Sequence, residues 1–138
     1  MPHHGVHSFE KVWLNEVLMK DDDKTQIEKI IRNRKEAHHF FTTHADSKVY
    51  KAFQEMQSAA FSPGTLSTMH KELIAVGISV VVNCESCMEW HIHQAILAGA
   101  TDRHIVEAIE VGIEIGGGAA TVSARFALKA LEYHQEKR

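Results

Sequence analysis

Apolar residues recur every three or four positions along most of this chain, which is the spacing of one face of an α-helix. A short first helix is predicted before residue 20, because apolar side chains stand four apart at Phe9, Trp13 and Val17. Residues 21–24 form a polar break whose aspartates suit a helix N-terminus. A helix follows from Thr25, with an apolar face that includes Ile27, Ile30 and Ile31.

The next helix is predicted from about Ser47 to Phe61. Its apolar residues fall on one face, which we expect to be buried: Val49, Tyr50, Phe53, Met56 and Ala60. The sequence Ser-Pro-Gly at residues 62–64 is a strong signal for a stop and a turn.

A mostly apolar helix is predicted from an N-cap at Ser67 to about Val82, and its apolar breadth indicates a central position. The β-branched residues at 78 and 80–82 also suit a strand. The sequence has no second strand-like run to pair with this segment, so a helix is the better interpretation.

Asn83 ends the central helix, and Cys84 begins another that runs to about Ala98, with Gly99 suited to its C-terminal cap. Thr101 then caps a fifth helix, whose apolar face carries Ile105, Ala108, Ile109 and Ile113. Three glycines at 116–118 break or kink the chain before a last helix with apolar residues at Val122, Phe126, Ala127, Ala130 and Leu131. The prediction is an all-α bundle of about six helices, with a Cys-x-x-Cys motif at a helix N-terminus.

The composition is that of an ordinary globular protein, with 44% hydrophobic and 24% charged residues in 138. The net charge of −3, without a cationic stripe, argues against nucleic acid as a partner. The longest apolar stretch, residues 73–82, is too short to span a membrane. The N-terminus has no apolar segment typical of a signal peptide, so we expect a cytoplasmic location.

The only two cysteines, Cys84 and Cys87, stand in one Cys-x-x-Cys motif, and His91 follows four residues later. Residues three, four and seven apart share a helix face, so both sulfurs and the imidazole should line one side. A helix N-terminus stabilises a thiolate, and His91 can take a proton from Cys87. Glu72, on the preceding antiparallel helix, is placed to orient the imidazole. This pattern favours a dithiol that attacks a peroxide oxygen, forms a sulfenic acid and then closes a disulfide.

A zinc site is the competing interpretation, with Cys84, Cys87 and His91 as three ligands and His93 or Glu72 as the fourth. Structural zinc sites usually show a second close pair of Cys or His ligands, and this chain has no second Cys pair. His93 is also expected on roughly the opposite face of the helix. The dithiol interpretation is therefore preferred.

The chain resembles the alkylhydroperoxidase D-like family, also called the carboxymuconolactone decarboxylase superfamily, over about residues 45–130. The resemblance rests on a spaced glutamate, the dithiol, the histidine, a Gly-Ala-Thr helix junction and two downstream segments: Glu72, Asn83, Cys84, Cys87, His91, Ala95, Gly99–Thr101, Glu107–Glu110 and Gly116–Gly118.

The resemblance implies an all-helical fold that assembles as homotrimers or homohexamers, and thiol-dependent peroxidase activity. In the family pattern Cys87 is the peroxidatic cysteine, Cys84 is the resolving one, and Glu72 and His91 form the proton relay. The helix dipole by itself favours Cys84 as the more acidic thiol. The family assignment is preferred because His91 lies one turn beyond Cys87. Ser86 stands where characterised peroxidases have a histidine.

We therefore expect a family-like domain over residues 45–138 and an N-terminal helical arm over residues 1–44. The expected partners are a hydroperoxide substrate and a dithiol electron donor, either a protein or a small thiol. Neither a metal nor an organic cofactor is expected to be needed.

Two alternatives remain open. A cofactor-free decarboxylase acting on a carboxylated lactone would need cationic side chains for the substrate carboxylates, and only Arg103 and Arg125 fall in plausible positions. Relatives with that activity generally lack the dithiol. The third hypothesis is a non-catalytic helical oligomer whose cysteines bind zinc or sense redox state.

Overall fold

The computed structural model describes residues 19–138, so the short helix predicted around Trp13 lies outside the described part of the chain. In that part every regular element is a helix, which confirms the all-α prediction. The elements are the α-helices α2 (Asp21–His39), α3 (Lys48–Phe61), α4 (Thr68–Val81), α5 (Glu85–Leu97) and α6 (Asp102–Glu136), with a π-helical turn η1 (Phe40–His44) between α2 and α3.

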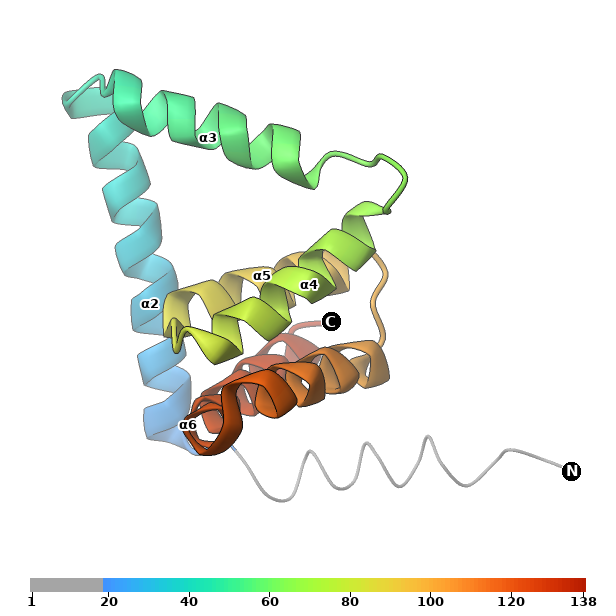
Figure 1. The fold of residues 1–138 in the computed structure, drawn as a ribbon. Helices are drawn as coiled ribbons and strands as arrows, with labels where there is room; N and C mark the ends of the chain where they lie inside the picture. The colour runs from blue at the N-terminus through green and yellow to red at the C-terminus, as the bar shows by residue number, and fades with distance from the viewer. Residues whose placement is uncertain (1–18) are drawn as a thin grey trace, which may run out of the picture.

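Helices α4, α5 and α6 pack against one another and form the body of the molecule, as Figure 1 shows. Helix α2 runs along one side of this body, and α3 leaves the far end of α2 and crosses above it (Figure 1). The centre of the body is filled by completely buried apolar side chains: Val76 and Val80 of α4, Met88 and Ile92 of α5, and Ile105 and Leu131 of α6. Ile27 anchors α2 to this core.

Three helices begin where the sequence predicts. In each case a hydroxyl oxygen accepts a hydrogen bond from the backbone N–H three residues further on, at Ser47, Ser67 and Thr101. Helix α2 instead begins at Asp21, four residues before the predicted start. The three aspartates form its first turn rather than preceding it, because negative side chains stabilise the positive end of the helix dipole.

The sequence predicted that the apolar face of α3 is buried, and within one copy of the chain this prediction is wrong. No residue of α3 is buried, and Val49, Phe53 and Met56 are 82%, 55% and 60% exposed. The periodicity correctly identified a helix and its apolar side. It could not show that α3 stands away from the body, where no other helix of residues 19–138 covers this side.

The kink predicted at the three glycines is present. Gly117 has φ 66° and ψ −147°, a conformation that glycine adopts without steric cost and that separates the two halves of α6. The first half of α6 crosses α4 at close range. A Cβ atom at Gly112 would lie only 2.8 Å from the carbonyl oxygen of Gly77, so this position requires glycine. Among residues 19–138, no helix combines the length and the apolar character needed to cross a membrane.

Candidate functional site

The turn between α4 and α5 fixes the position of the two cysteines. Asn83 has φ 53°, a left-handed conformation that asparagine tolerates better than most residues. Its side-chain oxygen accepts a hydrogen bond from the hydroxyl of Ser123 on α6, 2.9 Å away. The backbone N–H of Cys84 donates to the carbonyl of Ser79 in α4. The turn is thus tied to both neighbouring helices.

Cys84 is the N-cap residue of α5, and its sulfur accepts a hydrogen bond from the backbone N–H of Cys87 at 3.2 Å. The two residues are joined in a disulfide, with their Cα atoms 5.2 Å apart. Both are partly buried, so the pair is accessible at the surface of the body. This places the dithiol at a helix N-terminus, as the sequence analysis expected.

A carboxylate and an imidazole meet beside the dithiol. Glu72, in the second turn of α4, is only 4% exposed, and its Oε2 lies 2.7 Å from Nδ1 of His91. A carboxylate can only accept, so Nδ1 carries the proton and Nε2 of the neutral ring is left as a base. His91 follows Cys87 by four residues on α5, so the two side chains share a face. The structure thus pairs Glu72 with His91 and Cys84 with Cys87, and α5 carries His91 one turn beyond Cys87.

Phe61 is a member of this site that the sequence analysis missed. It is the last residue of α3, and its ring stacks on His91 with centroids 5.3 Å apart and an interplanar angle of 24°. The aromatic ring covers one side of the imidazole and shields it from water. No local pattern marks Phe61 as different from the other aromatic residues of α3, because the contact depends on how the loop after α3 folds back.

His93 does not join the dithiol. It lies with Glu89 and His134 in a separate cluster, where its ring stacks on that of His134. The zinc set that combined both cysteines and His91 with His93 is therefore not brought together. Of the two residues considered as a fourth zinc ligand, His93 is excluded.

A third feature is an open apolar groove of about 700 Å³ between α4 and the first half of α6. Aliphatic side chains line most of it, including Ile74, Ile78, Val81, Val111 and Ile115. Among the described residues, the only charged or ionisable ones that line it are Glu107 and two histidines. A lining of this kind, with no arginine or lysine from residues 19–138, does not suit a substrate that carries carboxylates.

Residues 47–130 match the sequence model of the carboxymuconolactone decarboxylase family. Two relatives have no assigned activity. Uncharacterized protein 4 in the cox locus of Paracoccus denitrificans is 37% identical over 91 residues, which cover 66% of this chain and 82% of that protein. An uncharacterized protein of Cupriavidus necator is 38% identical over 89 residues, which cover 64% of this chain and 76% of that protein.

Solved structures have the same fold. A carboxymuconolactone decarboxylase family protein from Legionella pneumophila has a TM-score of 0.69 and 27% identity, and the match covers 81% of this chain and 96% of that one. A protein of the same family from Thermotoga maritima, described as "possibly involved in antioxidative response", has a TM-score of 0.70 and 29% identity. That match covers 78% of this chain and 91% of the Thermotoga chain.

Proposed function

Since the chain belongs to the carboxymuconolactone decarboxylase family, we propose that it is the dithiol type of member, a thiol-dependent peroxidase or disulfide oxidoreductase that reduces hydroperoxides. The observation that carries the proposal is the Glu72–His91 pair beside Cys84 and Cys87. A base oriented by a buried carboxylate, within one helical turn of a thiol, is the arrangement that activates a sulfur nucleophile. The description of the Thermotoga relative supports the same chemistry.

In the proposed reaction, His91 Nε2 takes the proton of the Cys87 thiol. The thiolate attacks one peroxide oxygen, so that an S–O bond forms and the O–O bond breaks. The leaving alkoxide takes the proton from His91 and departs as an alcohol, or as water when the substrate is hydrogen peroxide. Cys87 is thereby oxidised to a sulfenic acid, and the peroxide is reduced.

The sulfur of Cys84 then attacks the sulfur of Cys87. The disulfide forms, the S–O bond breaks, and the hydroxyl leaves with a proton as water. An external dithiol restores both thiols by disulfide exchange and is itself oxidised to a disulfide. The carboxylate of Glu72 holds His91 in the required tautomer and stabilises the transient imidazolium.

The order of the two thiols is part of the proposal. Cys84 sits at the cap of α5 and Cys87 one turn inside it, so the helix N-terminus favours a thiolate at Cys84. Cys87 is nevertheless assigned as the peroxidatic thiol, because its side chain shares a helix face with the base. In this arrangement Cys84 resolves the sulfenic acid.

Assembly into a homotrimer or homohexamer also belongs to the proposal, with a second copy of the chain as the occupant of the apolar groove. Within the described residues of each copy, the apolar side of α3 and the apolar groove beside α6 are both exposed. The charges are complementary, because α3 begins with Lys48 and Lys51 whereas α6 exposes Glu107, Glu110 and Glu114. Residues 1–44 would then act as an arm and residues 45–138 as the family domain.

The deciding experiment measures hydroperoxide consumption by the reduced protein, with wild type, Cys87→Ser and Cys84→Ser compared. Turnover should require both cysteines, and Cys84→Ser should accumulate a sulfenic acid that a dimedone probe traps. Ser86→Ala is the matched control and should retain turnover, because Ser86 is exposed between the cysteines. Absence of thiol-dependent turnover with every hydroperoxide tested, or decarboxylation of a carboxylated lactone, would contradict the proposal.

A further inference from the structure

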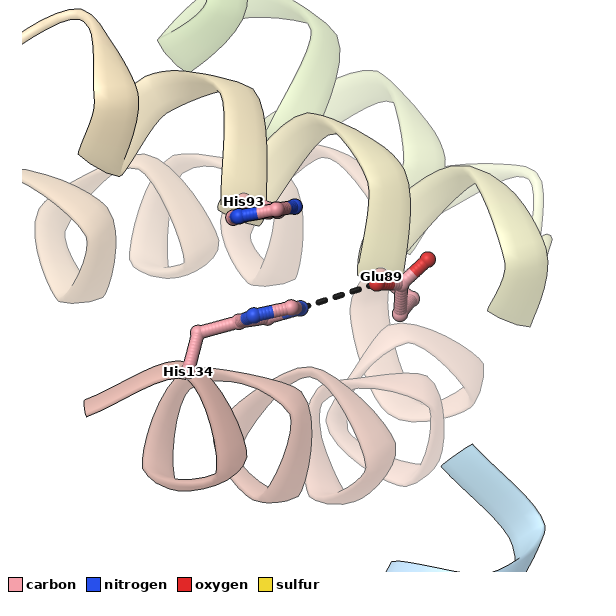
Figure 2. A group of neighbouring side chains, drawn as sticks. All are labelled: Glu89, His93 and His134. Carbon is pink, nitrogen blue, oxygen red and sulfur yellow. Dashed lines mark hydrogen bonds and ion pairs between the residues drawn. The ribbon is translucent and has the colours of Figure 1, made fainter. Parts of the chain in front are cut away.

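A second cluster of chemically active side chains lies on the side of α5 that faces away from the dithiol. Helical residues advance by about 100° each, so Glu89 and His93 share a face that is roughly 200° from Cys87 and His91. His134, near the C-terminal end of α6, completes this cluster. Figure 2 shows the imidazole of His93 above that of His134, with the carboxylate of Glu89 at the end of the His134 ring.

The three donors already lie close together. Nε2 of His134 is 2.8 Å from Oε1 of Glu89, and one donor atom from each of the three residues lies within 4.8 Å of the others. The rings of His93 and His134 are stacked, with centroids 4.2 Å apart and an interplanar angle of 5°. Within residues 19–138, His93 makes no hydrogen bond, so its ring nitrogens are available for another partner.

Burial and neighbouring charges shift the pKa values of two of these groups. Burial lowers the pKa of His93, and the nearby His134 lowers it further, which favours the neutral imidazole. Burial alone would raise the pKa of Glu89, but the hydrogen bond from His134 and the charge of Arg34 outweigh it and lower the pKa. Both shifts are in the direction that favours metal binding, and they only add to what the positions of the three side chains show.

From this geometry we infer that Glu89, His93 and His134 form a binding site for a divalent transition-metal ion of the zinc class. One carboxylate with two imidazoles is a donor set that zinc, cobalt and nickel favour. Calcium and magnesium prefer sites made of oxygen ligands, and this cluster has a single carboxylate. The site is separate from the dithiol and does not depend on the proposed peroxidase function.

Binding requires rearrangements at two of the three ligands. Ligands about 2.0–2.1 Å from a tetrahedral ion lie roughly 3.3 Å from each other, so Glu89 and His134 need to separate only slightly. The proton between them must leave Nε2 of His134 when the ion binds, because a ligating imidazole nitrogen carries no proton. A coordinated metal lies in the plane of each imidazole, so the ring of His93 must turn out of the parallel stack. His93 is only partly buried, which gives an ion access from solvent.

Arg34 is a positive group in direct contact with this site. Its guanidinium pairs with Oε2 of Glu89, whereas Oε1 faces His134. Arg34 also lies over the ring of Trp90, 4.9 Å from the centroid, and its charge and that of Lys35 both act on His93. Arg34 therefore orients the carboxylate, as partners behind metal ligands commonly do.

The test uses full-length protein in its disulfide form, so that no thiol can bind metal. His3, His4 and His7 are replaced by alanine in every sample, since terminal histidines can also capture metal ions. Zinc is titrated and quantified after dialysis, and cobalt is added separately as a spectroscopic probe. The variants are His93→Ala, which removes a partly buried ligand, and His44→Ala, which removes an exposed histidine from η1 as the matched control.

We expect one tightly held zinc ion per chain in the parent protein and in His44→Ala, and its loss in His93→Ala. Cobalt should give visible bands of nitrogen and oxygen coordination, and zinc should raise the unfolding temperature of the parent but not of His93→Ala. Equal zinc retention by the parent and His93→Ala, or no saturable binding, would overturn the inference. Unfolding of His93→Ala is also measured without metal. A curve that matches that of the parent protein establishes that the variant is folded. Because these readouts use the disulfide form, their failure leaves the peroxidase proposal untouched.

Discussion

Glu72 and His91 come from different helices and meet at 2.7 Å, with the carboxylate almost fully buried. The contact depends on the antiparallel crossing of α4 and α5, which places the second turn of α4 beside the second turn of α5. One short contact between helices therefore selects the imidazole tautomer in which Nε2 is the basic nitrogen. The chemistry proposed for Cys87 depends on this contact.

The first prediction concerns this pair. Glu72→Gln keeps the size of the side chain but removes its charge, so His91 loses the group that stabilises its protonated form. We expect kcat/KM for hydroperoxide reduction to fall by about 10²-fold, at the lower end of what acid–base catalysis contributes. The rate of peroxide reduction, measured from pH 5 to 9, checks this expectation.

The control for the Glu72 variant is Glu107→Gln, since Glu107 is exposed and belongs to the groove. It should leave both the rate and its pH dependence unchanged. A Glu72→Gln enzyme with wild-type rate across the whole pH range would show that the carboxylate has no part in the reaction.

A second prediction concerns one of the ion pairs that join α2 to the body, the pair of Arg34 with Glu89. Arg34→Met removes the guanidinium and leaves the completely buried carboxylate of Glu89 with His134 alone. Because Arg34 is itself a quarter exposed, we expect the free energy of unfolding to fall by about 2–3 kcal/mol, below the usual range for a fully buried pair. Urea denaturation at pH 7 measures the loss.

The pH dependence of the Arg34 variant follows from the lowered pKa of Glu89. A carboxyl group with a lowered pKa in the folded state stabilises the protein above its unfolded pKa, and this stabilisation disappears as the pH falls through the folded value. The difference between wild type and Arg34→Met should therefore shrink below pH 4.5, the ordinary value for glutamate. An Arg34→Lys variant should recover part of the stability. A constant difference at all pH values would argue against this pairing.

The third prediction concerns Glu132, where a substitution should increase the stability of the protein, whereas Arg34→Met should decrease it. Burial raises the pKa of Glu132, and the charge of Glu136 raises it further; its Oε2 is buried without a hydrogen-bond partner. A raised carboxyl pKa means that stability is lost as the pH rises from the unfolded value through the folded one. Glu132→Gln should therefore stabilise the protein by about 1 kcal/mol at pH 7.5.

Thermal unfolding at pH 7.5 and pH 4 separates this effect from a general change in packing. The gain from Glu132→Gln should be clear at pH 7.5 and small at pH 4, where the wild-type carboxyl is already largely protonated. Glu136→Gln, at an exposed position on the same helix, should give a smaller gain. A variant that is less stable than wild type at pH 7.5 would contradict the prediction.

The last prediction tests the proposed assembly. Phe53→Glu places a charge on the exposed apolar side of α3, and Ile78→Glu does the same in the groove. Each should shift sedimentation from an oligomer toward monomer, since neither apolar surface can then be covered. Ser58→Glu, also exposed on α3 but off the apolar side, should leave the oligomer intact. A wild-type protein that sediments as a monomer at micromolar concentration would refute the proposed assembly.

The sequence predicted where most of the helices begin and which residues lie on one face of a helix. It did not predict which distant segments pack against each helix. Ser47, Ser67 and Thr101 could be placed correctly because N-capping is a local property of a few residues. Glu72 and His91 could be paired because a short turn between two helices leaves them antiparallel. These inferences needed only helical geometry.

What remained hidden depends on contacts between distant segments. Phe61 reaches His91 only through the fold of the loop after α3, and Arg34 reaches Glu89 from a helix more than fifty residues away in sequence. Glu89 and His93 have a visible four-residue spacing, but nothing local indicates that His134 lies beside them. The apolar side of α3 is a further example, because the spacing of apolar residues identifies one face of a helix but not the segment that covers it.

Cys84 has two roles in this structure. Its sulfur is bonded to Cys87, and the same sulfur caps the N-terminus of α5 by accepting a hydrogen bond from the backbone N–H of Cys87. Replacing it by alanine would therefore mix a chemical loss with a structural one, because a missing cap typically costs about 0.5–2 kcal/mol. Serine supplies an oxygen that can cap the helix in its place. At this position, serine removes the redox chemistry and leaves the start of the helix supported, so it gives the cleaner measure of what the thiol contributes.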